Sequence, residues 1–167
     1  MTTSNGEQEA LRLERAVDAF VRRIKAVPAD QLTRAPAAGE WTLMELAAHS
    51  AEIYAYWAQQ LAYVRAHSGQ AFGRTASDPE RVKFVDDHKG DPLEGLVERL
   101  ERGAQAASAE LRAFTDAEWR TVTGLHSARG VMDMDFVAQL FVSGHAEEHL
   151  KQLEETLATV GEPFPPS

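Results

Sequence analysis

The 167-residue chain contains no cysteine. This absence excludes disulfides, thiol nucleophiles and cysteine-ligated zinc sites, so any metal would have to be bound by histidine, aspartate or glutamate. A thiol needed for a reaction would have to arrive as part of a small molecule.

Basic clusters and long apolar runs are also missing. The formal net charge is −9, so a nucleic acid backbone would be repelled. No stretch approaches the roughly 18 consecutive apolar residues of a membrane span, and the opening MTTSNGEQEA lacks the basic and apolar segments of a secretory signal. We therefore expect a cytoplasmic protein that binds a small molecule rather than nucleic acid or a membrane.

Alternation of apolar and polar residues, the pattern of a half-buried strand, never persists for more than a few residues. Apolar residues instead recur at three- and four-residue intervals, which predicts helices over about 7–27, 42–66, 93–114 and 133–160. The composition, 44% apolar and 26% charged, is typical of a globular chain. The sequence predicts an all-α four-helix bundle that forms a single domain over 1–167.

Capping signals mark where several of these helices begin. Thr42 followed by Glu45 forms a T-x-x-E capping box, and the same pattern at 115–118 predicts one short helical turn. Asp91, directly before a proline, marks the start of the third long helix.

The segment 67–90 is the least regular part of the chain and is rich in glycine, aspartate and other charged residues. Asp78 and Pro79 predict one short helix within it, with the aspartate as cap and the proline at the first position. This segment is the best candidate for a loop that covers a site.

Two histidines stand four residues apart in GHAEEHLKQL, residues 144–153. His145 and His149 form the pattern H-x-x-E-H, which is the signature of the inverted zinc metalloproteases. Those proteases take a third ligand from a glutamate well downstream, whereas the 18 residues after His149 are mostly the end of the same helix and a proline-rich tail. We therefore do not expect a protease.

The helical spacing points these histidines into the bundle. At about 100° per residue, His145 and His149 lie about 40° apart in the middle of the apolar face, and His49 shares an arc with Leu46 and Ile53 on the second helix. Three inward imidazoles from two helices provide the protein half of a catalytic zinc-type site, with further positions open to water or substrate. The alternative is that such a histidine pair arises by chance and has no metal-binding role.

Polar side chains on the same two helices are candidates to orient the imidazoles or to assist catalysis. Glu52, Glu148 and Gln152 are weak catalytic candidates, and only Gln152 lies squarely on the His145 face. For Glu45 the capping role is favoured. The other histidines are predicted to lie at the surface, with two of them (His88 and His126) able to border the site: His67, His88 and His126.

The stretches WTLMELAAH at 41–49 and GHAEEHLKQL at 144–153 resemble the DinB/YfiT-like superfamily of four-helix metalloproteins. The resemblance includes TDAEW and GLHSARGVMDMDF and so spans most of the chain. In that family one histidine on the second helix and an H-x-x-x-H pair on the last long helix bind a metal, and the matching residues are His49, His145 and His149. The resemblance implies an up-down-down-up bundle, often a homodimer, that holds Zn²⁺ or Ni²⁺.

The resemblance also implies an activity. Characterised family members include thiol S-transferases and thiol-dependent isomerases that act in detoxification, so we expect a metal-dependent enzyme that uses a low-molecular-weight thiol on small electrophiles. A metal could equally lower the pKa of bound water, as in a hydrolase. Two non-catalytic alternatives remain, a binding or sequestering bundle and a dimer that the metal only stabilises.

Overall fold

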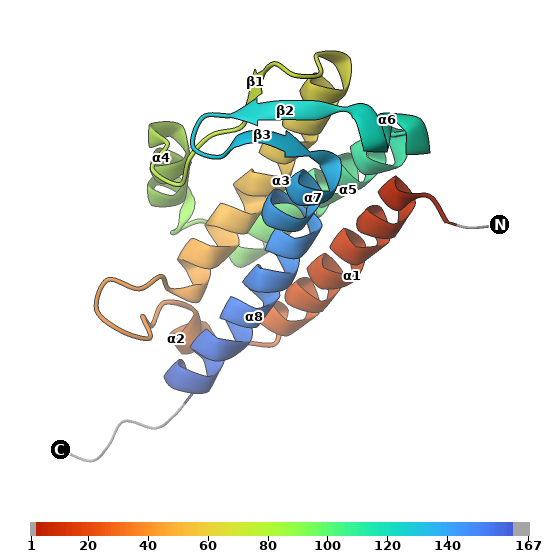
Figure 1. Cartoon of the computed structure of the whole chain (residues 1–167). Helices are drawn as coiled ribbons and strands as arrows, with labels where there is room; N and C mark the ends of the chain where they lie inside the picture. The colour runs from red at the N-terminus through yellow and green to blue at the C-terminus, as the bar shows by residue number, and fades with distance from the viewer. Residues whose placement is uncertain (1–2, 162–167) are drawn as a thin grey trace.

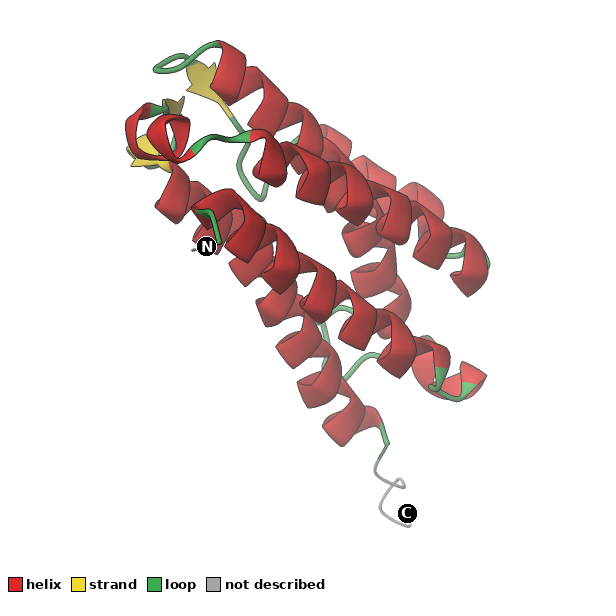
Figure 2. Cartoon of the chain, turned by 90° about the vertical axis from the view of Figure 1, so that its right-hand side faces the viewer, coloured by secondary structure: helices red, strands yellow, loops and turns green. Residues whose placement is uncertain are grey.

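The computed structural model describes residues 3–161, which form long helices with a small sheet at one end (Figures 1 and 2). The long helices are α1 (Asn5–Lys25), α3 (Leu43–Ala66), α5 (Leu93–Ala113) and α8 (Ser143–Val160). The shorter elements are α2 (Ala29–Leu32), β1 (Ala71–Phe72), α4 (Pro79–His88), α6 (Asp116–Thr121), β2 (Thr123–His126), β3 (Gly130–Asp133) and α7 (Met134–Phe141).

The four long helices form the predicted bundle. Helix α1 packs on α5 and α8, and α3 also packs on α5 and α8, so α1 and α3 are diagonal neighbours. Figure 1 shows α1 and α8 running in one direction and α3 and α5 in the other, which is the predicted up-down-down-up order. Because α4 and β1 cover α3 as well, α3 is buried on almost every side.

The core explains why these segments associate. Large apolar side chains at helical spacing are almost fully removed from water, among them Leu13 and Ile24 on α1 and Leu100 on α5. Each such side chain contributes about 1.5–3 kcal/mol when it is fully buried. The bundle therefore rests on the periodicity seen in the sequence.

Two predicted capping boxes are confirmed. The Thr42 hydroxyl accepts from the Glu45 amide at 3.2 Å, and the Glu45 carboxylate accepts from the Thr42 amide at 2.9 Å. Thr115 and Glu118 make the same reciprocal pair. These bonds satisfy amide groups that have no partner within a helix, so both helix starts are fixed by their own sequence.

The short helix in the segment 67–90 is also confirmed. It is α4, and Asp78 caps it by accepting from two backbone amides of its first turn. The start predicted at Asp91 is wrong in detail, because Pro92 occupies the N-cap of α5. The Asp91 carboxylate instead pairs with His88 Nδ1 at 2.8 Å, so it closes the turn between α4 and α5.

The prediction of one continuous last helix is wrong. The chain breaks at Val142, with φ −123° and ψ −90°, and this break separates α7 from α8. The next two residues, Ser143 and Gly144, form a Ser-Gly pair of the kind that permits sharp kinks. A Cβ at Gly144 would lie 2.0 Å from the Gln139 carbonyl oxygen, so only glycine lets α8 begin this close to α7.

The sheet was not predicted. Strand β2 pairs in parallel with β1 and antiparallel with β3, over two and four residue pairs respectively. Strands this short cannot show a recognisable alternation in the sequence. The sheet closes the end of the bundle near α6 and α7 and anchors the start of the segment that leads to α4 (Figure 1).

The helices of the bundle are amphipathic or interrupted by charged residues. In the part of the chain from 3 to 161, none combines the length and the apolar character needed to cross a bilayer.

Candidate metal centre

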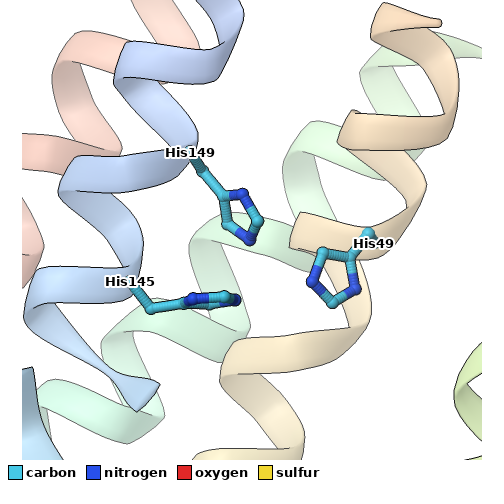
Figure 3. Close-up of side chains that lie close together, drawn as sticks. All are labelled: His49, His145 and His149. Atoms are coloured by element: carbon cyan, nitrogen blue, oxygen red, sulfur yellow. The ribbon is translucent and has the colours of Figure 1, made fainter. Parts of the chain in front are cut away.

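Three histidines converge inside the bundle (Figure 3). His49 comes from α3, and His145 and His149 come from successive turns of α8, as the helical spacing predicts. One ligand nitrogen from each ring lies within 4.8 Å of the other two. The ring centroids are 4.9 Å apart for His49 and His149, 5.9 Å for His49 and His145, and 4.2 Å for His145 and His149.

Two imidazole nitrogens at this point have no hydrogen-bond partner among the described residues. They are His49 Nδ1 and His149 Nε2, and both are inaccessible to solvent. An unpaired buried polar atom costs about 1–3 kcal/mol, so such atoms indicate a missing partner. A divalent cation would supply one, since imidazole nitrogens bind zinc at about 2.0–2.1 Å and small side-chain adjustments would bring all three into range.

Burial keeps the three rings in the form that binds metals. It lowers the pKa of His145 to about 4 and that of His149 to about 3, and it lowers the pKa of His49 well below its usual value. For His149 the neighbouring His145 adds to the effect, and the Gln152 side chain opposes it. All three imidazoles are therefore neutral at pH 7, and a neutral imidazole is the species that binds a cation.

A cavity of about 110 Å³ adjoins the histidines. Ile53, Trp57 and Phe141 form its apolar wall, and the last two rings stack at 4.4 Å. Trp41 places its edge against His49, with ring centroids 5.2 Å apart. These side chains make one side of the cavity apolar, next to the histidines.

The segment predicted to cover a site does so. Thr75 and Ala76 line the cavity, as do Arg74 and Arg81, the latter from the first turn of α4. The middle of α3, Phe141 at the end of α7 and His145 in the first turn of α8 form the opposite wall. The centre is thus closed by a part of the chain that is distant in sequence from its histidines.

His126 holds this covering segment in place. It was predicted to lie at the surface, but it is 3% exposed, and that prediction is wrong. His126 Nε2 donates to the Arg74 carbonyl at 3.1 Å, while Nδ1 accepts from the Ala128 amide at 3.2 Å. These two bonds fix one neutral tautomer, and the ring also stacks on Phe141, at 5.2 Å between centroids.

Comparison with known proteins identifies the family. The model of the DinB superfamily matches residues 12–153. This chain belongs to the DinB superfamily. No curated protein sequence matches it.

Several solved structures share this DinB superfamily fold. YfiT from Bacillus subtilis, described as a probable metal-dependent hydrolase with an unusual four-helix bundle topology, is 17% identical, with a TM-score of 0.80 over 97% of this chain and 92% of that one. The four-helix bundle protein TT2238 is 20% identical, with a TM-score of 0.65 over 89% and 98%. A mycothiol-dependent maleylpyruvate isomerase is 13% identical, with a TM-score of 0.66, and the match covers 96% of this chain but 64% of that one.

The three weak catalytic candidates, Glu52, Glu148 and Gln152, differ in their exposure to solvent and in their partners. Glu52 is partly buried and its two carboxylate oxygens each lie 2.5 Å from Arg74 Nη2, so it is committed to an ion pair. Glu148 is exposed to solvent. Gln152 lies beside His149 and can orient that ring. The structure therefore places one of the three next to the histidines without a competing ion pair.

Sequence reasoning missed the two arginines of the centre. Arg74 and Arg81 fall in the segment that was predicted to cover a site, and that position was the available signal. The segment around them has no helical periodicity that would show which side chains point inward. From the sequence alone, these two arginines therefore look the same as the exposed charged residues next to them.

Proposed function

We propose that this chain is a divalent-metal-dependent enzyme that acts on a small electrophile with a low-molecular-weight thiol, as an S-transferase or an isomerase. The observation that carries the proposal is the pair of buried, unpaired nitrogens, His49 Nδ1 and His149 Nε2, beside a cavity. Membership of the DinB superfamily and likeness to a mycothiol-dependent isomerase support the thiol. Because the chain has no cysteine, that thiol is a cosubstrate.

His49, His145 and His149 would hold Zn²⁺ or Ni²⁺ through neutral imidazoles. A cation held in this way lowers the pKa of a thiol or water in its open position, so that a nucleophile forms near neutral pH. Trp57 and Phe141 would give the reacting groups an apolar wall in the same space. Gln152, beside His149, would help to orient that ring.

Hydrolysis is the second candidate. The supporting observation is the likeness over nearly the full length to YfiT, which is described as a probable metal-dependent hydrolase. The same centre would then activate water in place of a thiol, and no other residue of the cavity would need a different role.

Metal binding is tested on purified protein. We expect about one equivalent of Zn²⁺ or Ni²⁺ per chain by elemental analysis, and His49→Ala, His145→Ala and His149→Ala should each weaken binding by at least about tenfold. His67→Ala is the matched control, because His67 is exposed and lies away from the centre. Failure of wild type to take up a cation after metal removal would refute the site.

Activity is tested on the metal-loaded protein. We would measure conjugation of a model electrophile with several low-molecular-weight thiols, and ester hydrolysis without thiol. Rates above the thiol-only background that disappear in His145→Ala support the transferase or isomerase, and turnover without thiol supports the hydrolase. If metal is bound but neither assay shows turnover, the result would favour a non-catalytic binding function over an enzyme. A large drop in melting temperature on chelation, also without turnover, would favour the structural metal.

We also propose a homodimer in the cytoplasm, which binds a small molecule and neither nucleic acid nor a membrane. Light scattering coupled to size-exclusion chromatography measures the molar mass in solution and so tests the homodimer. A single species with the 18.4 kDa mass of one chain would contradict it.

A further inference from the structure

The charge of the cavity differs in sign from that of the chain. The whole sequence has 26 acidic against 17 basic residues. The cavity beside the three histidines is nevertheless lined by two arginines, Arg74 and Arg81, and by no acidic residue of the described chain. With the imidazoles neutral, the field inside this space is positive.

Only one of these arginines is neutralised by a carboxylate. Arg74 is held by Glu52 at 2.5 Å, lies 3.8 Å from Asp78, and packs over the Tyr56 ring at 3.9 Å. Its side chain is 10% exposed, which is consistent with a structural ion pair. Arg74 therefore has little capacity left to bind a ligand.

Arg81 is in a different state. Its Nη1 donates to the Ala76 carbonyl at 2.7 Å, and its guanidinium lies 5.2 Å from the centre of the Trp41 ring. In the stretch 3–161 it forms no ion pair, and its Nε and Nη2 make no hydrogen bond. The Nε and Nη2 edge of a guanidinium is a fork that matches the two oxygens of a carboxylate.

Arg81 also acts electrostatically on the metal centre. Its side chain lines the same cavity as His49 and His145, and its charge contributes to lowering the pKa of all three histidines. Glu52 and Asp78 influence Arg81 only as more distant charges, and Arg74 opposes them. Partial burial of an unpaired cation costs free energy, and a bound counter-ion would offset that cost.

We propose that Arg81 binds the carboxylate of a small anionic substrate in the cavity beside the three histidines, an inference that rests on the proposed function. The substrate class is a short carboxylic acid. The volume of about 110 Å³ suits a group of about four to six non-hydrogen atoms, since a cavity of about 150 Å³ accommodates benzene. A planar carboxylate engages the free fork of Arg81 with two parallel hydrogen bonds.

The experiment compares pyruvate with its neutral analogue pyruvamide on the full chain, both as purified and after removal of metal by a chelator. Binding is followed by calorimetry and by tryptophan fluorescence, because Trp41 and Trp57 lie at the site. In a buffer of low ionic strength we expect pyruvate to bind at least about tenfold more tightly than pyruvamide in both forms.

Four variants make the test specific. Arg81→Met and Arg81→Gln should reduce pyruvate binding to the level of pyruvamide. Arg81→Lys keeps the charge without the fork and should bind pyruvate with intermediate affinity, which covers the case in which the methionine variant does not fold. Arg102→Gln is the matched control, since Arg102 is exposed on α5, pairs with Glu98 and should change nothing.

Three results would overturn the proposal. They are equal binding of pyruvate and pyruvamide by wild type, unchanged pyruvate binding by Arg81→Gln, or tighter binding of inorganic phosphate than of pyruvate. Because the metal-free protein is measured separately, failure of the metal site and failure of the carboxylate site give different outcomes. Selective binding of pyruvate without metal uptake refutes only the metal site. Metal uptake without selective binding of pyruvate refutes only the carboxylate site at Arg81.

Discussion

At the scale of single residues, the three histidines and His126 illustrate two uses of a buried imidazole. His126 has both ring nitrogens bonded to backbone groups, so its role is to hold the covering segment. His49 and His149 each retain a nitrogen without a partner. Burial alone therefore does not separate a structural histidine from a ligand, whereas an account of the partners of each nitrogen does.

Replacement of His126 tests its structural role. His126→Leu should leave the Arg74 carbonyl and the Ala128 amide unpaired, and we expect a loss of about 2–4 kcal/mol in the free energy of unfolding in urea. Amide exchange over residues 73–81 should accelerate, because the bond that anchors Arg74 is gone. His67→Leu, at an exposed position, should stay within about 0.5 kcal/mol of wild type. Unchanged exchange over 73–81 would contradict the anchoring role.

At the scale of elements, the long helices were predictable and their interruption was not. Apolar spacing predicted α1, α3 and α5 to within a few residues, and the two capping boxes predicted where α3 and α6 begin. The break at Val142 had only the Ser-Gly pair after it as a signal, and a Ser-Gly pair also occurs inside straight helices. The short strands were missed because their pairing is decided by partners distant in sequence.

The break between α7 and α8 predicts that position 144 requires glycine. Gly144→Ala would place a methyl group against the Gln139 carbonyl, so we expect a loss of about 2–4 kcal/mol in unfolding free energy, with α7 displaced. Gly95→Ala, in the first turn of α5 with open space around it, should be neutral or slightly stabilising. Chemical denaturation of both variants measures the contrast, and equal effects would show that close approach of α7 and α8 does not require Gly144.

At the scale of the whole molecule, the position of the candidate metal site was predictable because its three histidines lie on two long amphipathic helices. The direction of each side chain follows from helical periodicity once the helix is assigned. The covering segment had no such periodicity, so the charge of the cavity appeared only when α3, α4 and α8 were packed together. Sequence thus predicted which residues could bind a metal, and tertiary structure supplied the residue proposed to recognise the substrate.

Acid should destabilise the metal-free protein. A histidine with a folded-state pKa below its unfolded value of about 6.5 binds fewer protons when folded, so stability falls as pH falls through that range. The loss begins near pH 6.5 and continues to about 4 for His145 and about 3 for His149, which amounts to roughly 3 kcal/mol for the first ring and roughly 5 kcal/mol for the second.

Urea denaturation of chelated protein between pH 7 and pH 4 measures this loss. The double variant His145→Gln, His149→Gln should show a flatter dependence, and His67→Gln should follow wild type. Parallel curves for wild type and the double variant would mean that these rings do not titrate as their burial requires.

The histidines lie on α3 and α8, with almost a hundred residues between His49 and His145, and these two helices pack on each other less extensively than α3 packs on α5. A cation bound between them would act as a removable cross-link that stabilises the folded chain, because its ligand set exists only when the two helices are packed together. Because the chain has no cysteine, the stability of the contact between α3 and α8 would then depend on the concentration of available metal and not on the redox state of the surroundings.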